Sequence, residues 1–165
     1  MDVGYAYAEP FERAGIEALP IATIENKVVL PKTHPLAKLP IVNLRQLRGM
    51  DCICLPQDVS PQLFCTMKQL ASQYDFNIIT RSDIRNFYNK VAYVESQYSA
   101  AIVASPACEL ISKNLRAISI EGSPLLKLVR MTRSDISQRF KKRLRELEIV
   151  YLEKLPGARA IPGEV

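Results

Sequence analysis

The chain has 165 residues, 48% of them hydrophobic and 24% charged, with a formal net charge of +5. These values are typical of a soluble globular protein that forms one ordinary domain or two small lobes. No apolar run is long enough to span a bilayer, and residues 1–4 have neither the basic stretch nor the apolar core of a signal peptide, so we expect a cytoplasmic protein with no membrane partner.

The first third of the chain contains several apolar stretches that predict strands, at residues 2–8, 16–24, 27–31 and 50–56, with a polar loop at 10–15. Within the third stretch, Val28, Val29 and Leu30 form a continuous apolar block, as in strands that are covered on both faces. Before the fourth stretch, residues 43–48 predict one short helical turn, which Gly49 is placed to end.

The first long helix is predicted to begin at Ser60 and Pro61. Serine can cap free backbone donors, and proline suits the first helical position. Apolar side chains then recur at helical spacing, at Leu63, Phe64, Met67, Leu70, Ala71 and Tyr74. These are too many for a narrow core stripe, so we expect part of this face to reach the surface.

Strands and helices continue to alternate toward the C-terminus. Ser82 or Asp83 is expected to cap a second helix that carries Ile84, Phe87, Tyr88 and Val91 on one side. Further strands are predicted at residues 76–80, 100–104, 115–120 and 125–131, and a helical turn at 106–112. A last helix at about 136–152 is expected to point Phe140, Leu144, Leu147 and Tyr151 inward. The alternation predicts an α/β fold with a mainly parallel sheet.

The sequence contains no pattern typical of an enzyme active site or of a metal site. A Ser/His/Asp or Cys/His nucleophile needs a histidine base, and the single histidine, His34, lies in a proline-bounded loop. The six glycines never cluster into a phosphate-binding loop. Cys52 and Cys54 alternate within an apolar run, so we expect buried free thiols on one face of a strand. We therefore expect no catalytic residue, no metal site and no cofactor.

Much of the positive charge falls within the last predicted helix, at Arg139, Lys141, Lys142, Arg143 and Arg145. Such a run is typical of a solvated helix face, and no aromatic residues interleave with it to stack on bases. We expect no sequence-specific DNA binding by this chain.

Leu19-Pro20 is followed by the predicted strand at 27–31, and that strand leads into His34-Pro35-Leu36-Ala37. This order of segments resembles the effector-binding (substrate-binding) domain of LysR-type transcription regulators, in which a strand ends in His-Pro-Leu-Ala. The family continues with a short leucine-containing segment and a crossing strand, which correspond to 44–49 and 50–56. Gln46 stands where the family usually has aspartate.

A second part of the resemblance lies at residues 94–104, where the family has a helix-to-strand turn with two glycines. Gln97 and Ser99 replace them here. Because glycine permits a left-handed backbone, we expect an unusual turn. The closing strand and helix, 125–155, also resemble the family's, and the likeness covers residues 2–155.

The resemblance implies a two-lobed fold of the type II periplasmic-binding-protein kind. Its first lobe is expected to be incomplete and N-terminally truncated, because the family's winged helix-turn-helix, first strand and first helix would precede residue 1. Lobe one is expected at 1–54 and 121–155, lobe two at 57–119, and a loosely held tail at 156–165. The hinge is expected at Leu55, Pro56, Ile120 and Glu121.

The resemblance also implies a ligand-sensing function, with a small polar or anionic effector in the cleft between the lobes. The helix starts suggest Ser60, Ser82 and Asp83 as contacts, with Phe87 and Asn89 as weaker candidates. The other interpretation is that both serines are only helix caps. Rival functions are a solute-binding protein fragment, or an enzyme of a related fold.

The family's subunits dimerise through the first helix of lobe one and the lobe-two helix that starts here at Pro61. Because the former helix is missing, we expect a homo-oligomer that uses Leu63, Phe64, Met67 and Leu70 in a different arrangement. The alternative is a monomer whose helix turns inward. DNA is expected as a partner only through a helix-turn-helix domain absent from this chain.

Overall fold

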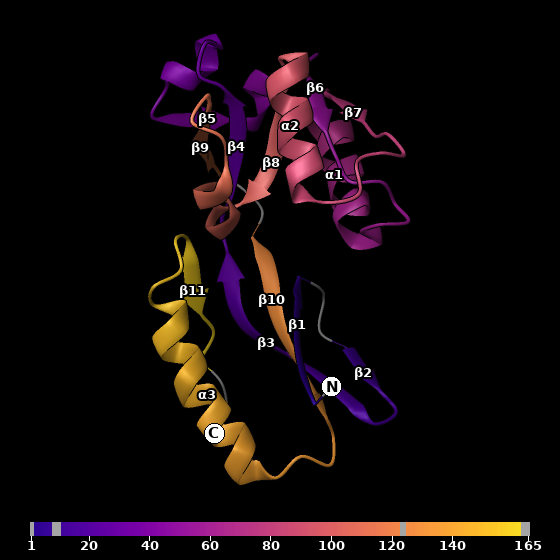
Figure 1. Ribbon diagram of the computed structural model, residues 1–165, viewed down its shortest axis with the longest axis vertical. Coiled ribbons are helices and arrows are strands. Elements are labelled where there is room, and N and C mark those ends of the chain that lie inside the picture. The colour runs from indigo at the N-terminus through magenta and orange to yellow at the C-terminus, as the bar shows by residue number, and fades with distance from the viewer. Residues whose placement is uncertain (1, 8–10, 123–124, 163–165) are drawn as a thin grey trace. The chain divides into compact units, whose positions relative to one another are not determined.

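The computed structural model describes residues 2–7, 11–122 and 125–162, and the chain divides into two compact units (Figure 1). Unit 1 comprises Met1–Glu25 and Pro124–Val165, and unit 2 comprises Asn26–Ser123. Each unit combines strands with at least one helix, which confirms the α/β class. Within the described residues no helix is long and apolar enough to cross a membrane.

Unit 1 is built on an antiparallel sheet with the strand order β1-β10-β3-β11, to which β2 adds by pairing with β3. The strands are β1 (Val3–Tyr7), β2 (Phe11–Arg13), β3 (Ile16–Ile24), β10 (Leu126–Arg133) and β11 (Ala158–Ala160). The predicted mainly parallel sheet is wrong here, because no helix connects β2 with β3, so the two form a hairpin. Gly15, at φ +79, permits its tight turn.

Two predictions for the ends of unit 1 need correction. The expected polar loop at 10–15 contains β2, and the expected loose tail contains β11, which pairs with β3 and is fixed by an ion pair between Arg159 and Glu25. The predicted positions Ala8, Pro10 and 163–165 lie outside the described residues.

Helix α3 (Gln138–Leu152) packs on this sheet with a charged stripe. Lys141 Nζ donates to Glu17 Oε2 at 2.6 Å, and Glu148, only 5% exposed, accepts from Arg130 Nη1 and from the Tyr5 hydroxyl, both at 3.0 Å. Three residues predicted to point inward, Phe140, Leu147 and Tyr151, are instead 47%, 57% and 63% exposed, and Leu144 is half-buried. That prediction is wrong because the sheet presents charged partners to the helix.

Unit 2 contains a four-stranded sheet, β5-β9-β4-β8, and a two-stranded parallel sheet, β6-β7. A bridge between Cys52 and Ala100 joins them. The strands are β4 (Asn26–Pro31), β5 (Ile41–Asn43), β6 (Asp51–Ile53), β7 (Asn77–Ile79), β8 (Ala101–Ala104) and β9 (Leu115–Glu121). The helices are α1 (Pro61–Tyr74) and α2 (Phe87–Gln97), with short 3-10 turns at Pro35–Lys38, Leu44–Leu47 and Ser105–Leu110.

Apolar cores cover both faces of the β6 region. Cys52 and Cys54 lie in the core that contains Met67 of α1, whereas Ile53, between them in sequence, lies in the core that contains Val94 of α2. This alternation confirms the predicted buried free thiols. Burial raises the pKa of the Cys52 thiol to about 12, so it stays protonated and unreactive at neutral pH.

The predicted turn after α2 is unusual, as expected from its missing glycines. Tyr98 ends the helix in the left-handed region, at φ 51, although it is not glycine. Its ring lies 5.5 Å from that of His34. This aromatic contact holds a backbone conformation that glycine would adopt without a steric cost.

The division between the units differs from the predicted lobes. Residues 26–54, expected in lobe one, lie in unit 2, because β4 pairs with both β8 and β9, and β5 pairs with β9. The chain therefore enters unit 2 at Asn26. Leu55 and Pro56, the predicted hinge, lie inside unit 2, and Ile120 and Glu121 are still paired with β5, just before the unit ends.

Candidate functional site

The strands of unit 2 bring several chain segments to one edge. Strands β6 and β7 are parallel, and the bridge to Ala100 places β8 parallel to β6, so the carboxyl ends of these three strands point to the same edge. Strand β4 starts there, with Asn26 opposite Ala104. We call this edge, with the loops at 54–60 and 80–86, the carboxyl edge. In open α/β sheets such an edge is where ligands bind.

Helix α1 starts at the carboxyl edge, directly after the loop from β6. Ser60 precedes Pro61 as predicted, but its hydroxyl makes no capping hydrogen bond. The cap role is therefore wrong, since Ser60, at φ −146 and ψ 81, directs its side chain elsewhere while its carbonyl accepts from Phe64 N. Its half-buried hydroxyl and the first-turn N–H groups are left to other partners.

Helix α2 also starts at the carboxyl edge, but later than predicted. Asn86, not Ser82 or Asp83, is its cap: the Asn86 Oδ1 accepts from Asn89 N at 2.9 Å. Sequence reasoning missed this residue although asparagine is among the best N-caps. Ser82 and Asp83 lie instead in an exposed turn.

Charged side chains organise the loop before α2. Asp83 accepts from Arg81 Nε at 3.2 Å and from the Tyr93 hydroxyl, and the Arg81 guanidinium lies 5.1 Å from the centre of the Tyr93 ring. The hydrogen bond from Tyr93, followed by that from Arg81, lowers the pKa of Asp83. Asp83 is thus an ionised partner within the loop and not a free acceptor for an anionic ligand.

A second ion pair ties the two loops of the carboxyl edge together. Arg85 Nη1 donates to Asp58 Oδ2 at 2.5 Å, and this hydrogen bond lowers the pKa of Asp58. Asp58 precedes α1 and Arg85 precedes α2. The pair therefore holds both helix starts in one arrangement.

Phe87 and Asn89, the remaining predicted effector contacts, both interact with neighbouring residues of unit 2. Phe87 is the first residue of α2. It is half-buried against the apolar core that contains Val94, which we call the α2-side core, and its ring is edge-to-face with that of Tyr88. The Asn89 amide oxygen accepts from Arg85 N at 3.4 Å. Ser105, which the prediction missed, follows β8; it is 1% exposed and its hydroxyl has no hydrogen-bond partner among the described residues.

The predicted oligomer surface on α1 is largely internal. Met67 and Leu70 are buried, and Leu63 and Phe64 are half-buried against the same core. Part of the apolar face of α1, at Leu63 and Phe64, thus remains partly exposed, as the sequence suggested, while Met67 and Leu70 pack in the core. The oligomer interface itself stays a prediction.

Lys90 is a buried amine that sequence reasoning did not single out. It lies on α2, and its Nζ donates to the carbonyl of Ile102 at 2.7 Å. Burial lowers the pKa of Lys90, against a smaller opposing effect of the thiols of Cys54, Cys52 and Cys108. Among the described residues no group of three or more His, Cys, Asp or Glu side chains is placed to hold a metal ion.

The comparisons with known proteins agree with this architecture. The family model described as the LysR substrate binding domain matches residues 1–145. None of the curated proteins matches the chain.

Solved structures are similar at low sequence identity. The regulatory domain of MetR, a LysR family regulator from N. meningitidis, is 17% identical with a TM-score of 0.69, over 98% of this chain and 78% of that one. The BenM effector binding domain with its effector benzoate is 13% identical with a TM-score of 0.73, over 92% and 70%. The CcmR regulatory domain from Synechocystis in complex with 2-PG is 14% identical with a TM-score of 0.67, over 90% and 73%.

Proposed function

Since this chain belongs to the LysR substrate binding domain family, we propose that it senses a small polar or anionic effector and thereby modulates transcription. Its relatives by structure are regulatory domains with the type II periplasmic-binding-protein-like fold, so a ligand-sensing regulatory role is the family's. The effector and the response are our proposal for this chain.

One observation carries the proposed site: α1 and α2 both start at the carboxyl edge, beside one another through the Arg85–Asp58 pair. Helix N-termini present unpaired N–H groups and a partial positive charge, which favour an anion. The Ser60 hydroxyl is not used as a cap and is available to a ligand. We place the effector between Ser60 and the start of α2 at Phe87 and Asn89, with Ser82 at the margin.

The relatives support an effector of this chemistry. The BenM domain binds benzoate, a carboxylate, and the CcmR domain binds 2-PG. We propose that this chain takes a metabolite with an anionic group of similar size. His34 lies outside the loops of the carboxyl edge, and the one thiol within them, that of Cys54, is buried, which raises its pKa. We propose binding without catalysis.

We propose that the effector response reaches DNA through a helix-turn-helix domain outside this chain, within a homo-oligomer. The partly exposed side of α1, at Leu63 and Phe64, remains a candidate for this interface. The large exposed side chains of unit 1, including Phe140, Leu147 and Tyr151, are a second candidate for subunit contact.

A thermal-shift screen of small carboxylates and phosphate esters, starting with benzoate, tests the site. A ligand that binds only the folded chain raises the melting temperature, and the shift grows with the logarithm of the ligand concentration once that concentration exceeds the Kd. Ser60→Ala should reduce the shift at fixed ligand concentration, whereas Ser72→Ala, an exposed serine further along the same helix, should not. If Ser60→Ala keeps the full shift, the effector site lies elsewhere.

A further inference from the structure

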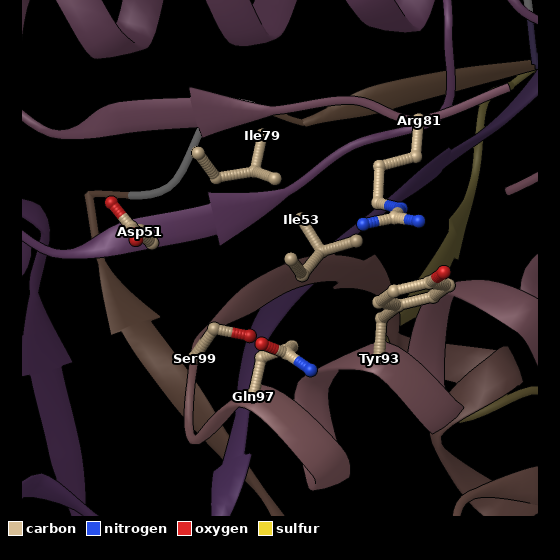
Figure 2. A pocket seen from close by; sticks show the side chains of 7 residues that line it. All are labelled: Asp51, Ile53, Ile79, Arg81, Tyr93, Gln97 and Ser99. Atoms are coloured by element: carbon tan, nitrogen blue, oxygen red, sulfur yellow. The ribbon is translucent and has the colours of Figure 1, made fainter.

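A second hollow lies in unit 2, on the flank between α2 and β7. Helix α2 packs over β4, β6 and β8, whereas β7 is the edge strand beyond β6. The space that this leaves is a cavity of about 150 Å³, lined by seven side chains from β6, β7, α2 and the residues that follow them (Figure 2).

Strand alternation determines which side chains line the floor. Ile53 lies opposite Ile79 in the register of β6 and β7, and both face the α2-side core. Asp51 is two residues before Ile53 on β6 and shares its face. Arg81 follows the end of β7 by two residues, and its side chain lines the same cavity at the end opposite Asp51 (Figure 2). Opposite charges therefore lie at the two ends of an apolar floor.

The α2 side adds polar groups above this floor. Tyr93 and Gln97 are one helical turn apart and both line the cavity. Ser99 lies beside Gln97 (Figure 2); it is 4% exposed, and its hydroxyl has no hydrogen-bond partner among the described residues. A buried hydroxyl without a hydrogen-bond partner is costly, and it adds a polar group to the wall of the cavity.

Both charged ends can take a further partner. The Arg81 side chain is 58% exposed, and its guanidinium, oriented by Asp83 and by the Tyr93 ring, has more N–H groups than its bond to Asp83 uses. The Asp51 carboxylate accepts from Asn77 Nδ2 at 2.9 Å and has lone pairs for another donor.

We propose that this cavity binds a short ω-amino carboxylate. Its carboxylate pairs with Arg81, its ammonium pairs with Asp51, and its methylene chain lies over Ile53 and Ile79. A cavity of this volume holds a molecule of about benzene size, so a ligand of about eight heavy atoms, such as 5-aminopentanoate, is the expected class. An α-amino acid with an uncharged side chain has both charges on one carbon and cannot reach both ends.

This site does not depend on the effector proposed at the carboxyl edge. The cavity reaches the carboxyl edge only at Arg81, in the loop at 80–86. Its other end, Asp51, is at the amino end of β6, and Ser60, Phe87 and Asn89 do not line it. A failure here therefore leaves the effector proposal standing, and the reverse also holds.

The test is an NMR titration of the 165-residue chain with 5-aminopentanoate, and with pentanoate and pentylamine as half-ligands. We expect saturable binding with a Kd of about 1 mM, since about 0.5 kcal/mol per heavy atom is within reach of small ligands. The shifted amides should belong to β6, β7 and the second half of α2. If the chemical-shift changes do not saturate by roughly 50 mM ligand, the proposal is overturned, because an affinity that weak does not indicate a specific site.

Charge-removing variants assign the two ends. Asp51→Asn should weaken 5-aminopentanoate about fivefold and leave pentanoate unchanged, and Arg81→Gln should weaken both carboxylates about fivefold and leave pentylamine unchanged. Glu109→Gln and Arg116→Gln, matched exposed positions outside the cavity, should change nothing. Equal affinities in Asp51→Asn and wild type, or equal losses in the matched variants, contradict the assignment.

Discussion

The two units bury opposite kinds of helix surface. In unit 2, α1 places Met67 and α2 places Val94 in apolar cores on the two faces of the sheet. In unit 1, α3 places Lys141 and Glu148 against the sheet and leaves most of its apolar stripe, including Phe140, Leu147 and Tyr151, exposed, while Leu152 at its end is buried. All three helices are amphipathic, so the periodicity of each sequence predicts an inward apolar face.

The difference comes from the surface opposite each helix. The sheet of unit 1 presents Glu17, Arg130 and the hydroxyl of Tyr5 to α3, and each is matched by a charged side chain of the helix. The strands under α1 present apolar side chains such as Val28 and Cys52. An amphipathic pattern thus identifies two stripes, but the opposing surface determines which one is buried. Unit 1 should accordingly depend on ion pairs, and unit 2 on apolar contacts.

The largest effect is expected at Glu148. Glu148→Ala leaves Arg130, 7% exposed, as a buried cation without its partner, which should lower the free energy of unfolding of unit 1 by about 3–5 kcal/mol. Urea denaturation followed by circular dichroism measures it. Glu146→Ala, which removes an exposed partner of Arg143 on the same helix, is the control and should cost far less. Equal losses in the two variants would remove the distinction between the units.

A smaller loss is expected from the core of unit 2. Met67→Ala removes a fully buried side chain and should destabilise unit 2 by about 3 kcal/mol. Leu147→Ala deletes a similar apolar volume from the exposed stripe of α3 and should cost less than about 0.5 kcal/mol. The same denaturation experiment checks both. If Leu147→Ala proves as costly as Met67→Ala, the apolar stripe of α3 is buried after all.

A gain in stability is expected at Lys90, the charged exception in unit 2. Lys90→Met keeps the side-chain length and removes a buried amine whose charged form is disfavoured by burial, which should stabilise unit 2 by about 1 kcal/mol at pH 7 despite the lost bond to Ile102. Folding lowers the pKa of Lys90, so the unfolded chain binds the extra proton and wild-type stability rises with pH toward about 10.4, the ordinary lysine value.

The advantage of Lys90→Met should therefore shrink as the pH is raised from 7 to 10. The denaturation midpoints of wild type and Lys90→Met, measured from pH 7 to 10, give the difference in stability. The thiols and tyrosines titrate in both proteins, so their contributions cancel in that difference. Lys68→Met, at an exposed position of α1, is the control and should show no such trend. A constant difference between wild type and Lys90→Met across the range contradicts the lowered pKa.

The smallest effect is expected at the exposed ion pair of unit 2. Asp58→Asn breaks the pair with Arg85, but both side chains are more than half exposed, so the denaturation midpoint should not change measurably. A benzoate titration of the same variant is more informative, because the pair holds the two helix starts of the carboxyl edge together. A large loss of stability instead would mean that unit 2 also relies on ion pairs.

The candidate site was only partly accessible from sequence. The Ser60-Pro61 helix start was located correctly, since proline at the first helical position acts locally, although the Ser60 hydroxyl does not cap the helix. The cap of α2 was placed too early, because Ser82, Asp83 and Asn86 are all good caps and only the folded loop selects among them. The Asp58–Arg85 pair joins residues 27 positions apart, and no local pattern indicates it.

The sequence by itself determined the α/β class, the position of most strands and helices, the buried thiols and, through the order of its segments, the family. These follow from local periodicity, from capping and from proline and glycine chemistry, which act over a few residues. Only the tertiary structure decided where the units divide, that β4 joins β8 and β9, and which stripe of α3 faces the sheet. Strand pairing and the burial of a helix face depend on the residues that long-range folding brings opposite them, and a stretch of sequence does not contain its partner.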